Sequence, residues 1–110
     1  MLEALWSVEF VSIEGWGTGV AVLETQRILG GDANYLYIGS FRVKGGKGYA
    51  EVEVKHYAGP SNSIIGDIKE FNLKLEGIID HDAFEMKGNI VELPAIPVVI
   101  RLTRRAELPD

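Results

Sequence analysis

Residues 30–39, Gly-Gly-Asp-Ala-Asn-Tyr-Leu-Tyr-Ile-Gly, place a glycine pair and an aspartate directly before an aromatic run. Glycine and aspartate favour tight turns, whereas tyrosine and isoleucine favour extended strands. The stretch therefore predicts a β-hairpin, with Asp32 in an Asx-type turn. Further turn sequences recur along the chain, at residues 14–17, 44–48, 59–62 and 80–82.

Between these turns, apolar and polar residues alternate with the period of two that is typical of half-buried strands. The alternation is clearest in residues 70–79, where apolar side chains share one face and polar side chains the other. In residues 18–24 the same reasoning places Val20 and Val22 inside, and residues 34–43 are apolar on both faces. The predicted strands are residues 4–13, 18–24, 34–43, 49–56, 70–79, 84–90 and 96–104.

About eight consecutive strands joined by short links predict an antiparallel meander, whose edge strands must be covered or closed. Closure into an eight-stranded antiparallel up-and-down β-barrel of the lipocalin or calycin type satisfies this requirement best, and a β-sandwich is the alternative. Residues 1–110 suffice for one such domain and leave no room for a second. A barrel of this size is either filled by its own side chains or holds one small apolar ligand. The side chains predicted to line such a cavity are Phe10, Val22, Val54, His56, Phe71, Leu73, Met86 and Ile100.

The composition is that of an ordinary globular protein, with 46% hydrophobic and 25% charged residues. A net charge of −5 would repel a phosphate backbone, so direct binding of nucleic acid is not expected. Without cysteine, the chain forms no disulfide and no thiolate metal site. No apolar run approaches the roughly 20 residues of a membrane helix, and the first residues lack the basic segment of a secretory signal. We therefore expect a cytoplasmic protein that makes no contact with a membrane.

Few residues have a pattern that indicates catalysis or metal binding. His56 lies on the apolar face of its predicted strand, where an imidazole can act as a base, bind a ligand or metal, or bond a neighbour. We favour the last interpretation. Asp80, His81 and Asp82 are consecutive in a turn, so their side chains point in different directions and are interpreted as turn residues. We therefore predict no enzyme, no catalytic residue, no metal site and no cofactor.

Several apolar residues fall on the outward face of the predicted strands. Leu36 and Ile38 do so in residues 34–43, and Val11 does so in residues 4–13. A strand that is apolar on both faces is typical of one whose outer face is covered as well. The three residues therefore predict a homodimer surface.

Several segments of the chain resemble the GrlR-type family, small bacterial proteins that act as negative regulators of type III secretion. The resemblance covers roughly residues 4–104 and includes the glycine pair, the aspartate and the Tyr-x-Gly that follows them. It implies a lipocalin-like, eight-stranded barrel that forms a homodimer and represses by binding a transcriptional activator rather than DNA. The residues that carry it are 6–12, 17–22, Gly30, Gly31, Asp32, Tyr37, Gly39, His56, Tyr57, Pro60 and Ser61.

Members of this family carry an acidic run in the loop after the Tyr-x-Gly strand, where this chain has Lys44-Gly45-Gly46-Lys47. A loop of opposite sign would not dock on the same basic partner surface. In this chain, Lys44 and Lys47 are the residues predicted to form the partner loop. The predicted function is a non-enzymatic regulatory module that binds a partner protein. The alternative is a small calycin-like carrier or sensor that holds an apolar ligand inside the barrel.

Overall fold

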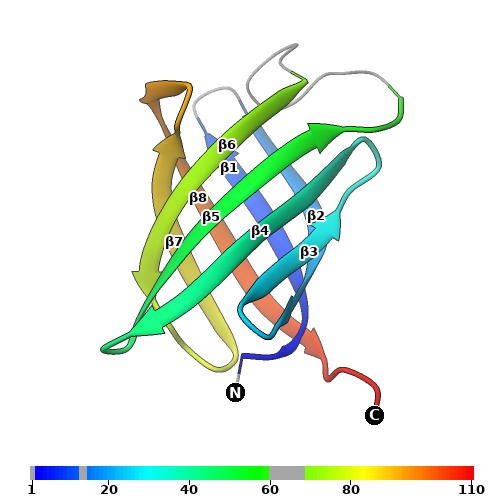
Figure 1. Ribbon diagram of the computed structural model, residues 1–110, viewed down its shortest axis with the longest axis vertical. Coiled ribbons are helices and arrows are strands. Elements are labelled where there is room, and N and C mark those ends of the chain that lie inside the picture. The colour runs from blue at the N-terminus through cyan, green and yellow to red at the C-terminus, as the bar shows by residue number, and fades with distance from the viewer. Residues whose placement is uncertain (1, 13–14, 60–68) are drawn as a thin grey trace.

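The computed structural model describes residues 2–12, 15–59 and 69–110, and these form an antiparallel β-barrel (Figure 1). Each strand pairs with the next along the chain, and the last also pairs with the first, which closes the sheet. Closure removes the unpaired edges that an open sheet would expose. The prediction of an eight-stranded up-and-down barrel is confirmed. The strands are β1 Ala4–Ser12, β2 Gly15–Glu24, β3 Arg27–Gly31, β4 Tyr35–Lys44, β5 Lys47–His56, β6 Glu70–Ile78, β7 Ala83–Ile90 and β8 Leu93–Ala106.

The strands with the clearest alternation bury the faces that the sequence predicts. In β5, Ala50, Val52 and Val54 are buried, and the residues between them point to the outside. Strands β6 and β7 alternate in the same way. Because successive side chains of a strand point to opposite faces, the barrel has one apolar interior and a largely polar exterior.

Strand β2 has the opposite orientation to the one predicted. Its buried side chains are Ala21 and Leu23, whereas Val20 is 50% exposed. Val22 shares the outward face with Val20 and is only partly buried. The prediction that Val20 and Val22 point inward is therefore wrong, and so is the assignment of Val22 to the cavity lining.

The small residues at positions 19 and 21 on the inner face of β2 are explained by the large side chains of the neighbouring strands. Pairing with β1 places Ala21 opposite the fully buried Trp6. A Cβ at Gly19 would lie 2.5 Å from the hydroxyl oxygen of Tyr37 on β4. Indole and phenol rings from β1 and β4 fill the space beside Gly19 and Ala21, so only small residues fit at these two positions.

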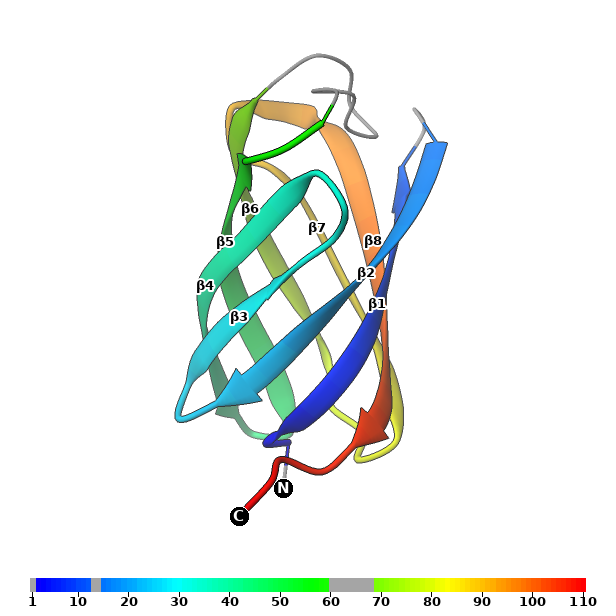
Figure 2. The same cartoon turned by 90° about the vertical axis from the view of Figure 1, so that its right-hand side faces the viewer.

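The prediction also misses β3, the short strand that forms a hairpin with β2. Thr25 and Gln26 form the turn between the two strands, and both have positive φ, 51° and 63°. Residues other than glycine, asparagine and aspartate seldom adopt this conformation. The turn therefore carries none of the usual sequence signals. The predicted Asp32 hairpin is confirmed and connects β3 to β4 (Figure 2).

Inward-facing glycines on β3 and β7 allow the backbones of neighbouring strands to approach closely. A Cβ at Gly30 would overlap the carbonyl oxygen of Val20 and lie 2.7 Å from the Cα of Ala21. At Gly88 a Cβ would overlap the carbonyl oxygen of Lys74. The obstructing atoms belong to the backbones of neighbouring strands and cannot rotate away. Glycine is therefore required at these two close approaches.

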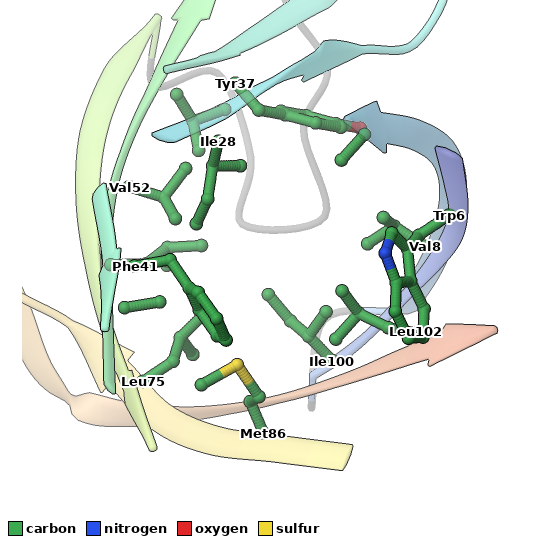
Figure 3. Close-up of a cluster of buried hydrophobic side chains, with 14 of the residues drawn as sticks. Trp6, Val8, Ile28, Tyr37, Phe41, Val52, Leu75, Met86, Ile100 and Leu102 are labelled. Carbon is green, nitrogen blue, oxygen red and sulfur yellow. The ribbon is translucent and has the colours of Figure 1, made fainter. Parts of the chain in front are cut away.

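Aromatic side chains organise the core (Figure 3). The Trp6 ring packs edge-on against Phe84, with a centroid distance of 5.2 Å, and its Nε1 donates a hydrogen bond to the carbonyl oxygen of Leu2. The rings of Phe10 and Tyr37 form a second edge-on pair at 5.1 Å. Among the described residues, no buried side-chain nitrogen or oxygen lacks a hydrogen-bond partner. The interior is thus well packed, and its described buried polar side-chain atoms are hydrogen-bonded.

Candidate functional site

The glycine–aspartate hairpin, the most informative motif of the sequence, has a structural role. The Asp32 carboxylate accepts hydrogen bonds from the backbone nitrogens of Asn34 and Tyr35, each at 2.8 Å, which is the predicted Asx-type turn. Its second oxygen accepts a hydrogen bond from the hydroxyl of Tyr37. The hydroxyl of Tyr57 donates to the backbone carbonyl of the same aspartate. All four hydrogen bonds therefore hold the hairpin together.

The environment of Tyr37 stabilises its neutral form. Burial raises the pKa of the phenol well above its ordinary value, and the hydrogen bond to the Asp32 carboxylate raises the pKa further. Both effects disfavour a second negative charge beside the carboxylate in a poorly solvated site. Tyr37 is thus a hydrogen-bond donor over the whole physiological pH range.

The barrel interior leaves an apolar space of only about 40 Å³. Figure 3 shows side chains such as Val8, Ile28 and Ile100 pointing toward the common centre that they surround. Pockets for drug-sized ligands are roughly 300–1,000 Å³. The space is therefore large enough for a very small apolar molecule and far too small for a lipid.

Four of the eight predicted lining residues border this space, namely Phe10, Leu73, Met86 and Ile100. Val54 and Phe71 are buried in the core but do not border it. Val22 is on the outer face, as described above. The structure adds lining residues that the sequence analysis did not select, and all lie on inward-facing strand positions. These are Val8, Ala21, Leu23, Ile28, Tyr37, Phe41, Ala50, Val52, Leu75 and Leu102.

His56 lies at the end of β5, away from the internal space. Its ring packs edge-on against Tyr35, with a centroid distance of 5.4 Å, and its Nε2 is 2.7 Å from the carbonyl oxygen of Gly59. The interpretation of His56 as a residue that bonds a neighbour is confirmed. Its assignment to the cavity lining is wrong, because β5 reaches the barrel end at this residue.

The Asp80–His81–Asp82 triplet is also structural. The Asp80 carboxylate accepts bonds from the backbone nitrogens of Asp82 and Ala83, at 3.2 and 3.4 Å, as expected of a turn. His81 Nδ1 contacts the Asp82 carboxylate at 2.9 Å on the exposed surface. Within residues 2–12, 15–59 and 69–110, no three metal-binding side chains come together. No helix in these ranges is long and apolar enough to cross a membrane.

Apolar side chains, most of them exposed, form a continuous patch on the outside of β1 to β4. The strand register places Val22 opposite Leu29, and Leu29 opposite Ile38, so these three form one row across the sheet. Figure 2 shows the strands that carry the row side by side. Leu29 and Ile38 are 47% and 42% exposed. The apolar patch consists of Leu5, Val20, Val22, Leu29, Leu36 and Ile38.

The apolar patch has a polar border. On β5, Glu53 lies opposite Ile38 and Lys55 lies opposite Leu36, and the two charged groups are 3.4 Å apart. Leu36 and Ile38, predicted to face outward, do so. Val11 is also exposed, but on β1 the charged Glu9 separates it from the patch. An apolar centre with a polar rim is the usual anatomy of a protein-binding surface.

The predicted partner loop is a tight two-residue turn at the end of the β4–β5 hairpin. Gly45 and Gly46 form it with φ values of 61° and 78°, and Lys44 pairs directly with Lys47. Lys47 forms a 2.9 Å ion pair with Glu76 on β6, and this carboxylate raises the pKa of Lys47. Lys47 is therefore directed toward the neighbouring strand.

Beside this turn an open groove of about 1120 Å³ crosses the outer face of β4, β5, β6, β7 and the start of β8. Figure 1 shows β4, β5 and β6 of these strands running side by side. We call this feature the outer groove. It was not predicted, because it depends on the curvature of the closed sheet. Its charged lining residues are Arg42, Lys47, Glu51, Lys74, Glu76 and Lys87.

The fold and these surfaces define a small lipocalin-like barrel with a nearly filled interior and two distinct outer features. Comparison with protein-family models finds no match, and comparison with curated proteins finds no significant similarity. Of the residues that carry the GrlR-type resemblance, Gly30, Asp32 and Tyr37 have the structural roles described above. Pro60 and Ser61 lie outside the described residues.

Proposed function

We propose that this protein is a non-enzymatic, cytoplasmic regulatory module that forms a homodimer and acts by binding a partner protein. The observation that carries the proposal is the apolar patch on β1 to β4. It is contiguous, largely exposed and bordered by charges, and such patches are characteristic of protein interfaces. In a homodimer, the patch of one subunit would meet the same patch of the other across a two-fold axis.

The barrel interior supports an interaction role over the alternative of a carrier or sensor. An internal space of about 40 Å³ lacks the volume for the fatty or polycyclic ligands of typical carriers. A nearly filled barrel leaves the outer surface and the loops available for function. The carrier hypothesis would require the core side chains to move apart, at the expense of the contacts that stabilise them.

The resemblance to GrlR-type regulators supports a transcriptional activator as the class of partner. The acidic chain favours a protein partner over DNA, because its net charge of −5 opposes approach to phosphates. Repression would then follow from occupying the activator, with no reaction catalysed by the barrel.

The dimer proposal is tested by native mass spectrometry of the protein purified gently from its expression host. We expect a dimer for the wild type and a monomer for Ile38→Glu, because one carboxylate per subunit would be buried at the centre of the interface. Val91→Glu is the matched control, since Val91 is 44% exposed, close to the 42% of Ile38, and lies outside the patch. Circular dichroism checks that both variants keep the β-barrel.

The same spectra address the alternative function. A retained mass that is lost on denaturation would support the carrier or sensor, whereas a dimer without added mass supports the interaction module. A wild type that is monomeric at micromolar concentration, or a dimer that survives Ile38→Glu, would remove the apolar patch as the dimer surface.

A further inference from the structure

The outer groove is electropositive although the chain as a whole is acidic. Four cationic side chains line it, Arg42, Lys47, Lys74 and Lys87, against two carboxylates, Glu51 and Glu76. The whole chain has a net charge of −5. Positive charge is thus concentrated in one concave region, where it attracts acidic ligands more strongly than on a flat surface.

The two carboxylates neutralise only part of this charge. Glu76 is paired with Lys47, and Glu51 lies opposite Lys74 in the register of β5 and β6. In the part of the chain that the structure describes, no ion pair engages Arg42 or Lys87. Glu85 lies two residues before Lys87, but its carboxylate is bound by Arg101 at 2.7 Å. Lys87 lies opposite Glu76 in the register of β6 and β7, but the Glu76 carboxylate is bound by Lys47. Among the described residues, Arg42 and Lys87 therefore have no bonded carboxylate of their own, and both can contact an external anion.

The aromatic ring of Tyr49 lies close to two of the cations of the groove, Arg42 and Lys47. The Arg42 guanidinium carbon is 5.4 Å, and the Lys47 ammonium nitrogen 5.7 Å, from the centroid of the Tyr49 ring. Cations on an aromatic face are held in place by the ring's negative π surface. Tyrosine is also enriched in protein interfaces, because it offers a large apolar surface and a polar end. The groove thus combines ordered cations with an aromatic contact.

We propose that the outer groove binds an acidic, extended segment of the partner protein, which rests on the proposed function that the partner is a protein. Arg42 and Lys87 contact the carboxylates of the segment, and Tyr49 packs against its backbone or an apolar side chain. Five strands spaced about 4.8 Å apart span about 19 Å, which matches roughly six extended residues at 3.3 Å each. Glu51 and Glu76 in the groove disfavour continuous phosphate backbones, which cannot avoid them.

The test measures binding of fluorescein-labelled octaglutamate to the purified protein by fluorescence anisotropy at low salt. We expect Lys87→Glu and Arg42→Glu each to weaken binding about tenfold, because each replaces an attraction by a repulsion. The control is Lys69→Glu, which makes the same charge change at an exposed site outside the groove and should alter affinity less than twofold. Binding should weaken as salt is added.

Three results would overturn the proposal. They are no binding of octaglutamate up to millimolar concentration, equal weakening by Lys69→Glu and Lys87→Glu, or preferential binding of a labelled single-stranded octanucleotide. The Ile38→Glu variant separates this proposal from the previous one. Failure of Ile38→Glu to dissociate the dimer, together with groove-dependent octaglutamate binding, would refute the apolar patch and leave the groove. Dissociation of the dimer by Ile38→Glu, without groove-dependent octaglutamate binding, would support the apolar patch and refute the proposal for the outer groove.

Discussion

The hydroxyl of Tyr37 donates a 2.5 Å hydrogen bond to Oδ2 of Asp32, and this bond connects the β3–β4 turn to the core of the barrel. The other oxygen of the same carboxylate closes the turn through two backbone nitrogens. One side chain therefore fixes both the hairpin and the ring that packs against the glycine face of β2. The aspartate and tyrosine of the motif thus have a clear role in the fold.

Asp32→Ala should lower the free energy of unfolding by about 2–4 kcal/mol. The substitution removes the acceptor of three hydrogen bonds and leaves a partly buried phenol without its partner. Tyr37→Phe removes one of these bonds and should cost about 1–2 kcal/mol. Urea unfolding followed by circular dichroism measures both values.

Asp82→Ala is the matched control for the loss of an aspartate in a turn. Its carboxylate side chain is 87% exposed and contacts the exposed His81 in the surface ion pair. The expected change is below about 0.5 kcal/mol. Equal destabilisation by Asp32→Ala and Asp82→Ala would show that the carboxylate of Asp32 has no special role.

The stability of the wild type should fall above pH 10 in a way that depends on Tyr37. Burial and the bond to Asp32 raise the pKa of this phenol in the folded state, whereas in the unfolded chain it titrates near 10. Below pH 10 both states keep the proton, so the group contributes no pH dependence. Above pH 10 only the unfolded state releases it, which lowers the free energy of unfolding by about 1.4 kcal/mol per pH unit.

Tyr37→Phe removes this contribution. Between pH 9 and pH 11 the variant should lose about 1.4 kcal/mol less stability than the wild type, by urea unfolding at each pH. Absorbance at 295 nm should show that one phenol of the folded wild type titrates only as the protein unfolds. Equal losses in the two proteins would mean that the folded-state pKa of Tyr37 is close to its unfolded value.

Gly30→Ala should destabilise the barrel by more than about 3 kcal/mol or prevent folding. The added methyl group would overlap backbone atoms of β2, and a closed sheet cannot separate two strands without breaking their hydrogen bonds. Gly46→Ala is the control, since a Cβ there meets no atom within 4 Å and only the positive φ of 78° opposes it. That variant should lose about 1 kcal/mol. Thermal unfolding measures both, and a Gly30→Ala protein as stable as Gly46→Ala would contradict the need for glycine at this close approach of β2 and β3.

The sequence predicts the fold because, in most strands, the alternation of polar and apolar residues determines which face is buried. In β6, polar and apolar residues alternate without exception from Glu70 to Glu76. Each residue therefore favours one face independently of the rest of the chain. Turns marked by glycine or aspartate define the ends of such strands, as the Asp32 and Gly45–Gly46 turns do.

The buried face of β2 could not be predicted from the residues of this strand alone, because residues 20–23 are apolar on both faces. The choice is made by Trp6 and Tyr37, which lie on other strands and occupy the inner space. Strand β3 was missed for another reason, since Thr25 and Gln26 do not mark a turn with positive φ. Long-range packing and an unusual turn thus account for both errors.

The surface features were also predictable from the sequence only in part. The outward positions of Leu36 and Ile38 follow from parity in β4 and could be predicted. The patch that they form with Leu29 depends on a strand that the sequence did not reveal, and the outer groove depends on the curvature of the closed barrel. Both surfaces are properties of strand register, which no single segment determines.

Ala50→Val should stabilise the barrel by about 0.5–1 kcal/mol and leave the oligomeric state unchanged. Ala50 is buried on β5 and borders the internal space of about 40 Å³, so two added methyl groups can enter a volume that is otherwise unoccupied by side chains. Urea unfolding measures the gain, and native mass spectrometry reads the oligomeric state of the same sample. Ala83→Val, at an exposed position of β7, controls for the higher strand propensity of valine. If Ala50→Val instead abolished partner binding while the fold persisted, the interior would take part in function and the carrier or sensor would be the better hypothesis.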